Sequence, residues 1–82
     1  MAYSVYIVRC SDDTLYTGIT TDLDKRIQEH NGSEKGAKYT RNRRPVSLVY
    51  HEVSEDRSTA SKREYAIKKM RRKEKLALIA NA

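Results

Sequence analysis

The chain has 82 residues, of which 38% are hydrophobic and 34% charged, and its formal net charge is +6 at pH 7. This length allows one domain with one small core, and the single cysteine excludes an internal disulfide and indicates a reducing, cytoplasmic setting. The first residues lack a basic flank before their apolar run, and no stretch approaches the roughly eighteen apolar residues of a membrane helix, so we expect neither a signal peptide nor a membrane partner.

Two short strands are predicted near the start of the chain. Residues 3–10 (YSVYIVRC) and 15–20 (LYTGIT) are rich in β-branched and aromatic side chains. The SDDT segment between them has the composition of a turn. We therefore expect a β-hairpin, with one tyrosine in each strand at Tyr6 and Tyr16.

Residues 22–31 (DLDKRIQEHN) predict the first helix, which Asp22 can cap. At about 100° per residue, with Leu23 at 0°, His30 falls near −20° and Arg26 near −60°. Both lie along the edge of the stripe that faces the sheet. One interpretation is an arginine that covers the edge of the core and a satisfied buried histidine. The other is a functional pair.

Residues 32–45 (GSEKGAKYTRNRRP) contain glycines and a terminal proline, which predicts a loop, and residues 46–53 (VSLVYHEV) predict a third strand. Residues 54–81 are helical in composition. The expected order is β-β-α-β-α, with a further short helix if the last one breaks. This order predicts an α/β sandwich in which helices pack on a small, three-stranded, mostly antiparallel sheet.

The last helical region has a candidate cap at Ser54 or Asp56 and a candidate break near residues 71–73. With Ala60 at 0°, Glu64 falls near +40°, within the apolar stripe of the helix. An ion pair with the lysine one turn later would explain the glutamate as a surface feature. Its inward position also makes it a metal or acid–base candidate.

Positive charge is concentrated in the second half of the chain. Residues 1–34 carry a net charge of −3, and residues 35–75 carry +9. This asymmetry indicates a polyanionic partner, most often nucleic acid, although solvated surface charge is the simpler alternative. The basic residues that we expect to line the nucleic-acid backbone are Lys35, Lys38, Arg41, Arg43 and Arg44 in the loop, and Lys68, Lys69, Arg71 and Arg72 in the last helical region.

Two phenols, an arginine, an imidazole and a carboxylate can thus come together: Tyr6, Tyr16, Arg26, His30 and Glu64. Phosphodiester hydrolysis needs a base for water, cationic donors for the phosphate and a carboxylate for a hard cation. In order and spacing, these residues resemble a GIY-YIG nuclease domain. Within that superfamily the chain is similar to the small YhbQ-like proteins of family 0213 (UPF0213).

The resemblance depends on two triplets, SVY at 4–6 and YTG at 16–18, whose tyrosines lie ten residues apart. Arg26, His30 and Glu64 match the family positions for an arginine, a histidine or tyrosine, and a metal-binding glutamate. The KGAKYTR segment resembles one found in YhbQ-like proteins and in structure-specific nucleases. The resemblance covers residues 1–82 as a single domain.

The resemblance implies roles for all five residues. Tyr6 is the general base for the attacking water, and Tyr16 orients that water or stabilises the phosphate. Arg26 and His30 contact phosphate oxygens. Glu64 holds one divalent cation, Mg²⁺ or Mn²⁺. The implied activity is a monomeric, metal-dependent endonuclease that prefers DNA to RNA, with structure selectivity and a link to DNA repair as further expectations.

Three positions depart from the family pattern. Ser4 replaces a glycine, Ile19 stands where some members carry a lysine, and Leu76 lies near the place expected for an asparagine. The first replacement should be harmless, but the missing lysine and asparagine favour an alternative, a nucleic-acid-binding module with little turnover or one that needs a protein partner. A third alternative is a protein-interaction subunit, which would not require Glu64 to face inward.

The length of the hairpin turn decides whether the two tyrosines can share a site, because side chains alternate between faces of a sheet. A two-residue turn would pair Arg9 with Tyr16 and place Tyr6 on the other face. A three-residue turn would pair Val8 with Tyr16 and Tyr6 with Gly18, whose missing side chain leaves room for the ring. We predict an odd turn, or a bulge of the same parity, with the tyrosines on the face that carries the arginine, histidine and glutamate.

Overall fold

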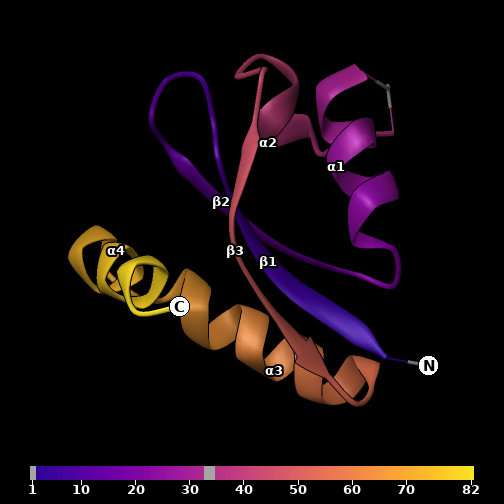
Figure 1. The fold of residues 1–82 in the computed structure, drawn as a ribbon, viewed down its shortest axis with the longest axis vertical. Coiled ribbons are helices and arrows are strands. Elements are labelled where there is room, and N and C mark those ends of the chain that lie inside the picture. The colour runs from indigo at the N-terminus through magenta and orange to yellow at the C-terminus, as the bar shows by residue number, and fades with distance from the viewer. Residues whose placement is uncertain (1, 33–34) are drawn as a thin grey trace.

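The computed structural model describes residues 2–32 and 35–82 (Figure 1). It confirms the α/β architecture, with strands ordered β2-β1-β3 in one antiparallel sheet and helices packed on it. The elements in chain order are β1 (Tyr3–Arg9), β2 (Leu15–Thr20), α1 (Leu23–Gly32), α2 (Lys38–Arg41), β3 (Ser47–Ser54), α3 (Arg57–Lys68) and α4 (Arg72–Ala80).

The hairpin has the register predicted for a three-residue turn. Val8 pairs with Tyr16, and Tyr6 pairs with Gly18. The turn closes where the Cys10 N–H donates to the Thr14 carbonyl at 2.8 Å, which leaves residues 11–13 between the strands. The last turn residue is in the left-handed region with φ of 67°, the conformation that ends a three-residue hairpin loop. The two tyrosines therefore lie on one face of the sheet.

The two faces of the sheet bury separate clusters. Val5 and Ile7 pack against Ala60 and Ile67 of α3 on one face. Tyr6 and its neighbours on the other face pack with α1. In Figure 1 the sheet runs between α1 and α2 on one side and α3 and α4 on the other. Among the helices of the described residues, none is long and apolar enough to cross a membrane.

The predicted helical region near the C-terminus forms two helices. Asp56 caps α3, because its carboxylate accepts from the Thr59 N–H at 2.8 Å. The helix ends at Lys68 and α4 begins at Arg72, so the predicted break is confirmed slightly before its expected place. At the start of α4 the Arg71 N–H donates to the Glu74 carboxylate at 3.1 Å, which satisfies a donor exposed by the break.

The segment predicted as a loop at 32–45 contains the short helix α2, and that part of the prediction is wrong; residues 33–34 lie outside the described part of the chain. The backbone just before α2 lies close to α1: a Cβ on Gly36 would lie 2.7 Å from the Glu29 carbonyl oxygen. At the far end of the segment, the Asn31 side chain exchanges two hydrogen bonds with the Val46 backbone, at 2.6 and 3.1 Å. These contacts fix α2 beside the end of α1.

Gly18 is required by the Tyr6 ring. A Cβ at residue 18 would lie 2.6 Å from the Tyr6 hydroxyl oxygen, and the ring is 1% exposed, so it has no free space into which to move. We expect Gly18→Ala to lower the free energy of unfolding by about 1–3 kcal/mol, measured by urea denaturation.

Gly32→Ala is the matched control, because a Cβ at residue 32 has no neighbour within 4 Å. Alanine is the better helix former, so the control should be neutral or stabilise by less than about 1 kcal/mol. Equal stability of Gly18→Ala and the wild type would contradict the tight contact.

Candidate active site

Tyr6 and Tyr16 reach the site from neighbouring strands and meet the same side chain of α1. The Tyr6 hydroxyl lies 2.7 Å from His30 Nε2. The Tyr16 ring contacts the His30 ring edge to face, with centroids 5.4 Å apart. Strand pairing on one side and the last turn of α1 on the other thus place two phenols around one imidazole.

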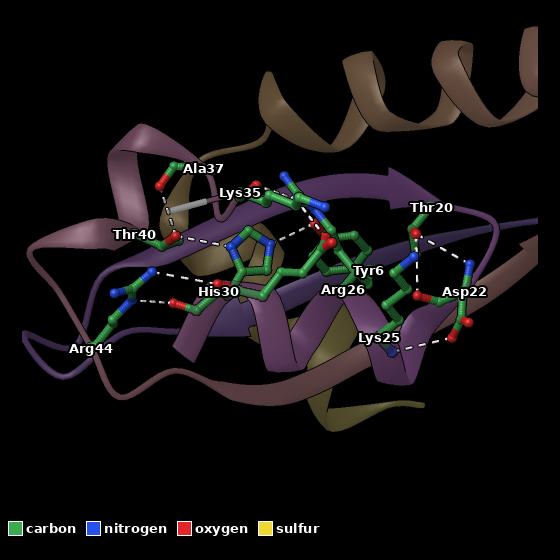
Figure 2. Close-up of polar contacts among 11 residues, drawn as sticks. Tyr6, Thr20, Asp22, Lys25, Arg26, His30, Lys35, Ala37, Thr40 and Arg44 are labelled. Carbon is green, nitrogen blue, oxygen red and sulfur yellow. Dashed lines mark hydrogen bonds and ion pairs between the residues drawn. The ribbon is translucent and has the colours of Figure 1, made fainter. Parts of the chain in front are cut away.

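His30 is fully buried, and both of its ring nitrogens have partners. Besides the contact with Tyr6, Nδ1 lies 2.9 Å from the Thr40 hydroxyl oxygen (Figure 2). Burial, helped by the charge of Arg26, lowers the pKa of His30 to about 4, so the ring is neutral at pH 7. A direct contact between His30 and a phosphate, as predicted from the sequence, does not fit this placement, because Tyr6 and Thr40 occupy both nitrogens.

Arg26 lies one turn before His30 and is partly exposed. One of its terminal nitrogens donates to the Glu29 carboxylate at 3.1 Å and to the Lys35 carbonyl at 2.7 Å. Beside it is an open groove of about 330 Å³ lined by Thr20, Thr21, Asp22, Lys25, Arg26 and Glu29. The charge of Arg26 also acts on the Tyr6 hydroxyl, so this side chain lies between the buried tyrosine and a surface groove.

The Tyr6 hydroxyl is held in its neutral form. Burial raises the pKa of Tyr6, while the neighbouring Arg26 guanidinium lowers it; Tyr16 and Glu64 add to the rise. The net direction is upward, so the positive charge of Arg26 offsets burial only in part. Tyr6 acting as a base would therefore need an acceptor for the proton it already carries.

Glu64 approaches this site from the other side of the sheet. Its helix, α3, packs against the face that carries Val5 and Ile7, so the prediction that Glu64 shares a face with the tyrosines is wrong. Its carboxylate pairs with Lys68 at 3.5 Å, and the Lys68 ammonium lies 5.9 Å from the centroid of the Tyr16 ring. The glutamate thus lies beside edge strand β2, near the tyrosines.

Glu64 is the carboxylate that lies beside the two tyrosines. Within residues 2–32 and 35–82, no three His, Cys, Asp or Glu side chains gather to hold an ion. The Glu64 side chain is 24% exposed, and Lys68, which pairs with it, is half exposed and able to move away. A single accessible carboxylate suits Mg²⁺ or Mn²⁺ bound mainly through water and substrate oxygens.

Two of the predicted nucleic-acid-binding arginines stabilise the fold. Arg43 donates to the Asp12 carboxylate at 3.0 Å and to the Tyr39 carbonyl at 2.7 Å. Arg44 donates to the carbonyls of Glu29 and His30 at the end of α1. Both side chains therefore hold the segment before β3 in place, whatever else they bind.

The other predicted basic residues lie nearer the surface. Their contacts within the chain include Lys68 with Glu64, Arg72 with the Asp13 carboxylate at 3.2 Å, and Lys69 over the Tyr65 ring at 4.7 Å. The side chains of Lys35, Lys38, Arg41 and Arg71 are also exposed. The structure thus spreads the predicted residues over two regions, around α2 and around the junction of α3 and α4.

Two residues around His30 were not predicted from the sequence. Thr40 contacts Nδ1, and Tyr39 stacks on Tyr16 with centroids 5.8 Å apart and rings inclined by 24°. Both come from α2, in the segment predicted as a loop. Their spacing from α1 and β2 carries no periodic signal that could have indicated these contacts.

The chain resembles known proteins over most of its length. The family model described as the GIY-YIG catalytic domain matches residues 2–77. The chain is 63% identical over 78 residues to UPF0213 protein DP2720 of Desulfotalea psychrophila, covering 95% of this chain and 71% of that protein. It is 54% identical over 78 residues to a UPF0213 protein of Staphylococcus aureus, covering 95% and 94%.

Two solved structures resemble this chain in both fold and sequence. The solution NMR structure of UPF0213 protein BH0048 from Bacillus halodurans has a TM-score of 0.63 and 44% identity, covering 98% of this chain and 84% of that one. The solution NMR structure of EF2693 from E. faecalis has a TM-score of 0.68 and 41% identity, covering 99% and 85%. The resemblance predicted from the two triplets is confirmed.

The buried histidine makes stability depend on pH. The folded pKa of His30, about 4, is below the ordinary value of 6.5, so between these values the unfolded chain binds a proton that the folded chain does not. The free energy of unfolding should therefore fall by about 3 kcal/mol from this group as the pH drops from 6.5 to 4. NMR titration of His30 should give the same folded pKa.

His51→Gln is the control for this titration, because His51 is exposed in β3. This control should retain the steep loss of stability, whereas His30→Gln should lose the part that comes from His30. A titration of His30 near 6.5 in the folded protein would contradict the buried neutral ring.

Proposed function

This chain belongs to the GIY-YIG catalytic domain family, and within it to the UPF0213 proteins, and from this premise we propose that it is a divalent-cation-dependent endonuclease. It hydrolyses phosphodiester bonds in nucleic acid, with DNA preferred to RNA. The observation that carries the proposal is the Tyr6 hydroxyl, held 2.7 Å from neutral His30 and beside the Arg26 guanidinium. Branched DNA is the substrate to test first, for structure selectivity and for a role in repair.

Tyr6 acts as the general base. Its oxygen accepts a proton from the attacking water, and the proton that it already carries moves to His30 Nε2, 2.7 Å away. The phenol thus stays neutral throughout, and the positive charge is on the imidazole. This route does not require the phenolate, whose formation burial opposes. It does charge His30, whose pKa burial lowers to about 4, so the negative charge of the bound phosphate has to stabilise the imidazolium.

Arg26 binds the phosphate and stabilises the charge that develops on it. Its guanidinium is always protonated and presents donors in a fixed planar fork, which suits phosphate oxygens. The Glu29 carboxylate and the Lys35 carbonyl hold it in place at the groove. Tyr16, which stacks on Tyr39 and meets His30 edge to face, orients the water or the scissile phosphate.

Glu64 would hold the Mg²⁺ or Mn²⁺ ion at the edge of β2. Such an ion, when bound, supplies positive charge that neutralises phosphate oxygens. Before it binds, the Glu64 carboxylate pairs with Lys68, which is thus a competing cation at the same oxygen atoms.

A second candidate function is a nucleic-acid-binding module with little turnover. Ile19 favours it, because this side chain packs against the core cluster under α3 and supplies no cation that could help ionise a tyrosine. The raised pKa of Tyr6, which comes mainly from burial, also favours the binding module, because it disfavours the phenolate. Cleavage assays separate the two functions.

The cleavage test uses purified protein with branched, duplex and single-stranded DNA and RNA, in Mg²⁺ or Mn²⁺. Glu64→Ala and Tyr6→Phe should each lower the cleavage rate by about 100-fold or more, because one removes the metal ligand and the other the base. Binding to DNA should change less than about threefold, since neither side chain is a cationic phosphate contact.

Matched controls are Glu55→Ala and Tyr65→Phe, which alter an exposed acid before α3 and a tyrosine that is 61% exposed on it. Both should cut at the wild-type rate. If Glu64→Ala and Tyr6→Phe also cut at that rate, other residues carry the activity. Binding without cleavage in either metal would favour the binding module.

The binding test reverses charge on α2. Lys38→Glu with Arg41→Glu should weaken binding to every DNA sequence by a similar factor and lower the slope of log affinity against log salt by about 1–2. Filter binding or fluorescence anisotropy over a salt series measures both quantities.

Arg57→Glu with Lys62→Glu makes the same change in net charge at exposed sites in the first half of α3, far from α2 (Figure 1). This control should retain most of the affinity. An affinity that does not depend on salt would overturn the proposed backbone contact.

A further inference from the structure

Thr40 is a buried hydroxyl whose hydrogen-bonding direction the structure determines. Its side chain is 0% exposed. Its oxygen lies 3.0 Å from the Ala37 carbonyl oxygen and 2.9 Å from His30 Nδ1. A carbonyl only accepts, so the single hydroxyl hydrogen of Thr40 points to Ala37. Towards His30 the hydroxyl can therefore only accept.

The direction of the hydrogen bond at Thr40 determines which nitrogen of the His30 imidazole carries the hydrogen. Because Thr40 accepts, Nδ1 of His30 carries a hydrogen and donates it. The ring is neutral at pH 7, so Nε2 then carries none and is an acceptor. Its partner at 2.7 Å is the Tyr6 hydroxyl, which must donate. Figure 2 shows this continuous chain, from Tyr6 through His30 and Thr40 to Ala37.

From this chain we propose that Thr40 is a positioning residue that fixes the His30 tautomer and thereby turns the Tyr6 hydroxyl hydrogen inward. The remaining lone pairs of the Tyr6 oxygen then face away from His30, as acceptors. In the other tautomer, Nε2–H would donate to Tyr6 and the phenol hydrogen would point outward. Tyr6 would then be a donor to the substrate in place of a base. The catalytic meaning of this orientation rests on the proposed function, but the orientation itself does not.

The surroundings of Tyr6 and Thr40 support the inference independently. The charge of Arg26 lowers the pKa of the Tyr6 hydroxyl, so a guanidinium lies near this oxygen. A guanidinium carries no acceptor, so it cannot compete with His30 for the phenol hydrogen. The helix that carries Thr40 is held by contacts outside the chain of hydrogen bonds: Arg43 with the Tyr39 carbonyl, and Arg44 with the end of α1. Thr40 is thus a fixed acceptor.

The test reads the tautomer directly by ¹⁵N NMR of histidine-labelled protein at pH 7, without substrate. The chain has two histidines, so His51→Gln assigns the His30 signals. The wild type should show the Nδ1–H tautomer. Thr40→Val, which keeps the shape and removes the acceptor, should shift the ring to Nε2–H or to a mixture. Thr40→Ser, which keeps the hydroxyl, should restore the wild-type signals.

Amide NMR spectra establish that each variant is folded. If Thr40→Val does not fold, the wild type and Thr40→Ser still decide the question. An Nε2–H tautomer in either of these, or an unchanged Nδ1–H tautomer in a folded Thr40→Val, would overturn the proposal.

The cleavage assay provides the functional reading. Thr40→Val should lower kcat roughly tenfold or more with KM within about twofold, because the base is lost and the phosphate contacts remain. Thr40→Ser should recover most of kcat. A tautomer shift with unchanged kcat would overturn the catalytic part of the proposal. If the wild type does not cleave, the proposed function fails, whereas the tautomer result still tests the positioning role.

Discussion

The buried hydrogen bond between the Tyr6 hydroxyl and His30 Nε2 is the interaction on which the rest of the site depends. It joins the middle strand of the sheet to the last turn of α1, so the packing of the helix also places the candidate base. Either group would cost about 1–3 kcal/mol if it were buried unpaired. Each satisfies the other, and the second ring nitrogen brings α2 into the core through Thr40. The same few residues therefore determine both the local stability and the position of the candidate base.

Local periodicity was enough to predict the parts of the site that lie within one element. The pairing of Tyr6 with Gly18 followed from turn length and strand alternation. The angular positions of Arg26 and His30 on α1 indicated the edge of the core, where the structure has them 24% exposed on the side chain and fully buried, respectively. In each case strand alternation or helix periodicity acts over a few residues, so the sequence alone is enough to place the side chains.

Contacts between distant elements could not be predicted in this way. Thr40 meets His30 through the packing of a short helix that composition alone presented as a loop. The charge pattern predicted Arg44 as a phosphate ligand, but its guanidinium donates to backbone carbonyls. A count of charges cannot reveal such a contact. Glu64 had the predicted inward angle, but the side of the sheet on which its helix packs is set by the apolar cluster of Val5 and Ile7. Tertiary packing decides all three.

Burial acts on both partners of the central hydrogen bond in the same sense. It raises the pKa of Tyr6 and lowers that of His30, so both neutral forms are favoured and the pair at rest carries no charge. The charges of the site lie around the pair, on Arg26 and Glu64. A bound phosphate and cation would change the field at these outer groups first, and the proton in the Tyr6–His30 bond would respond. Under the proposed function, cleavage requires that substrate charge move that proton towards the histidine, whereas binding alone does not.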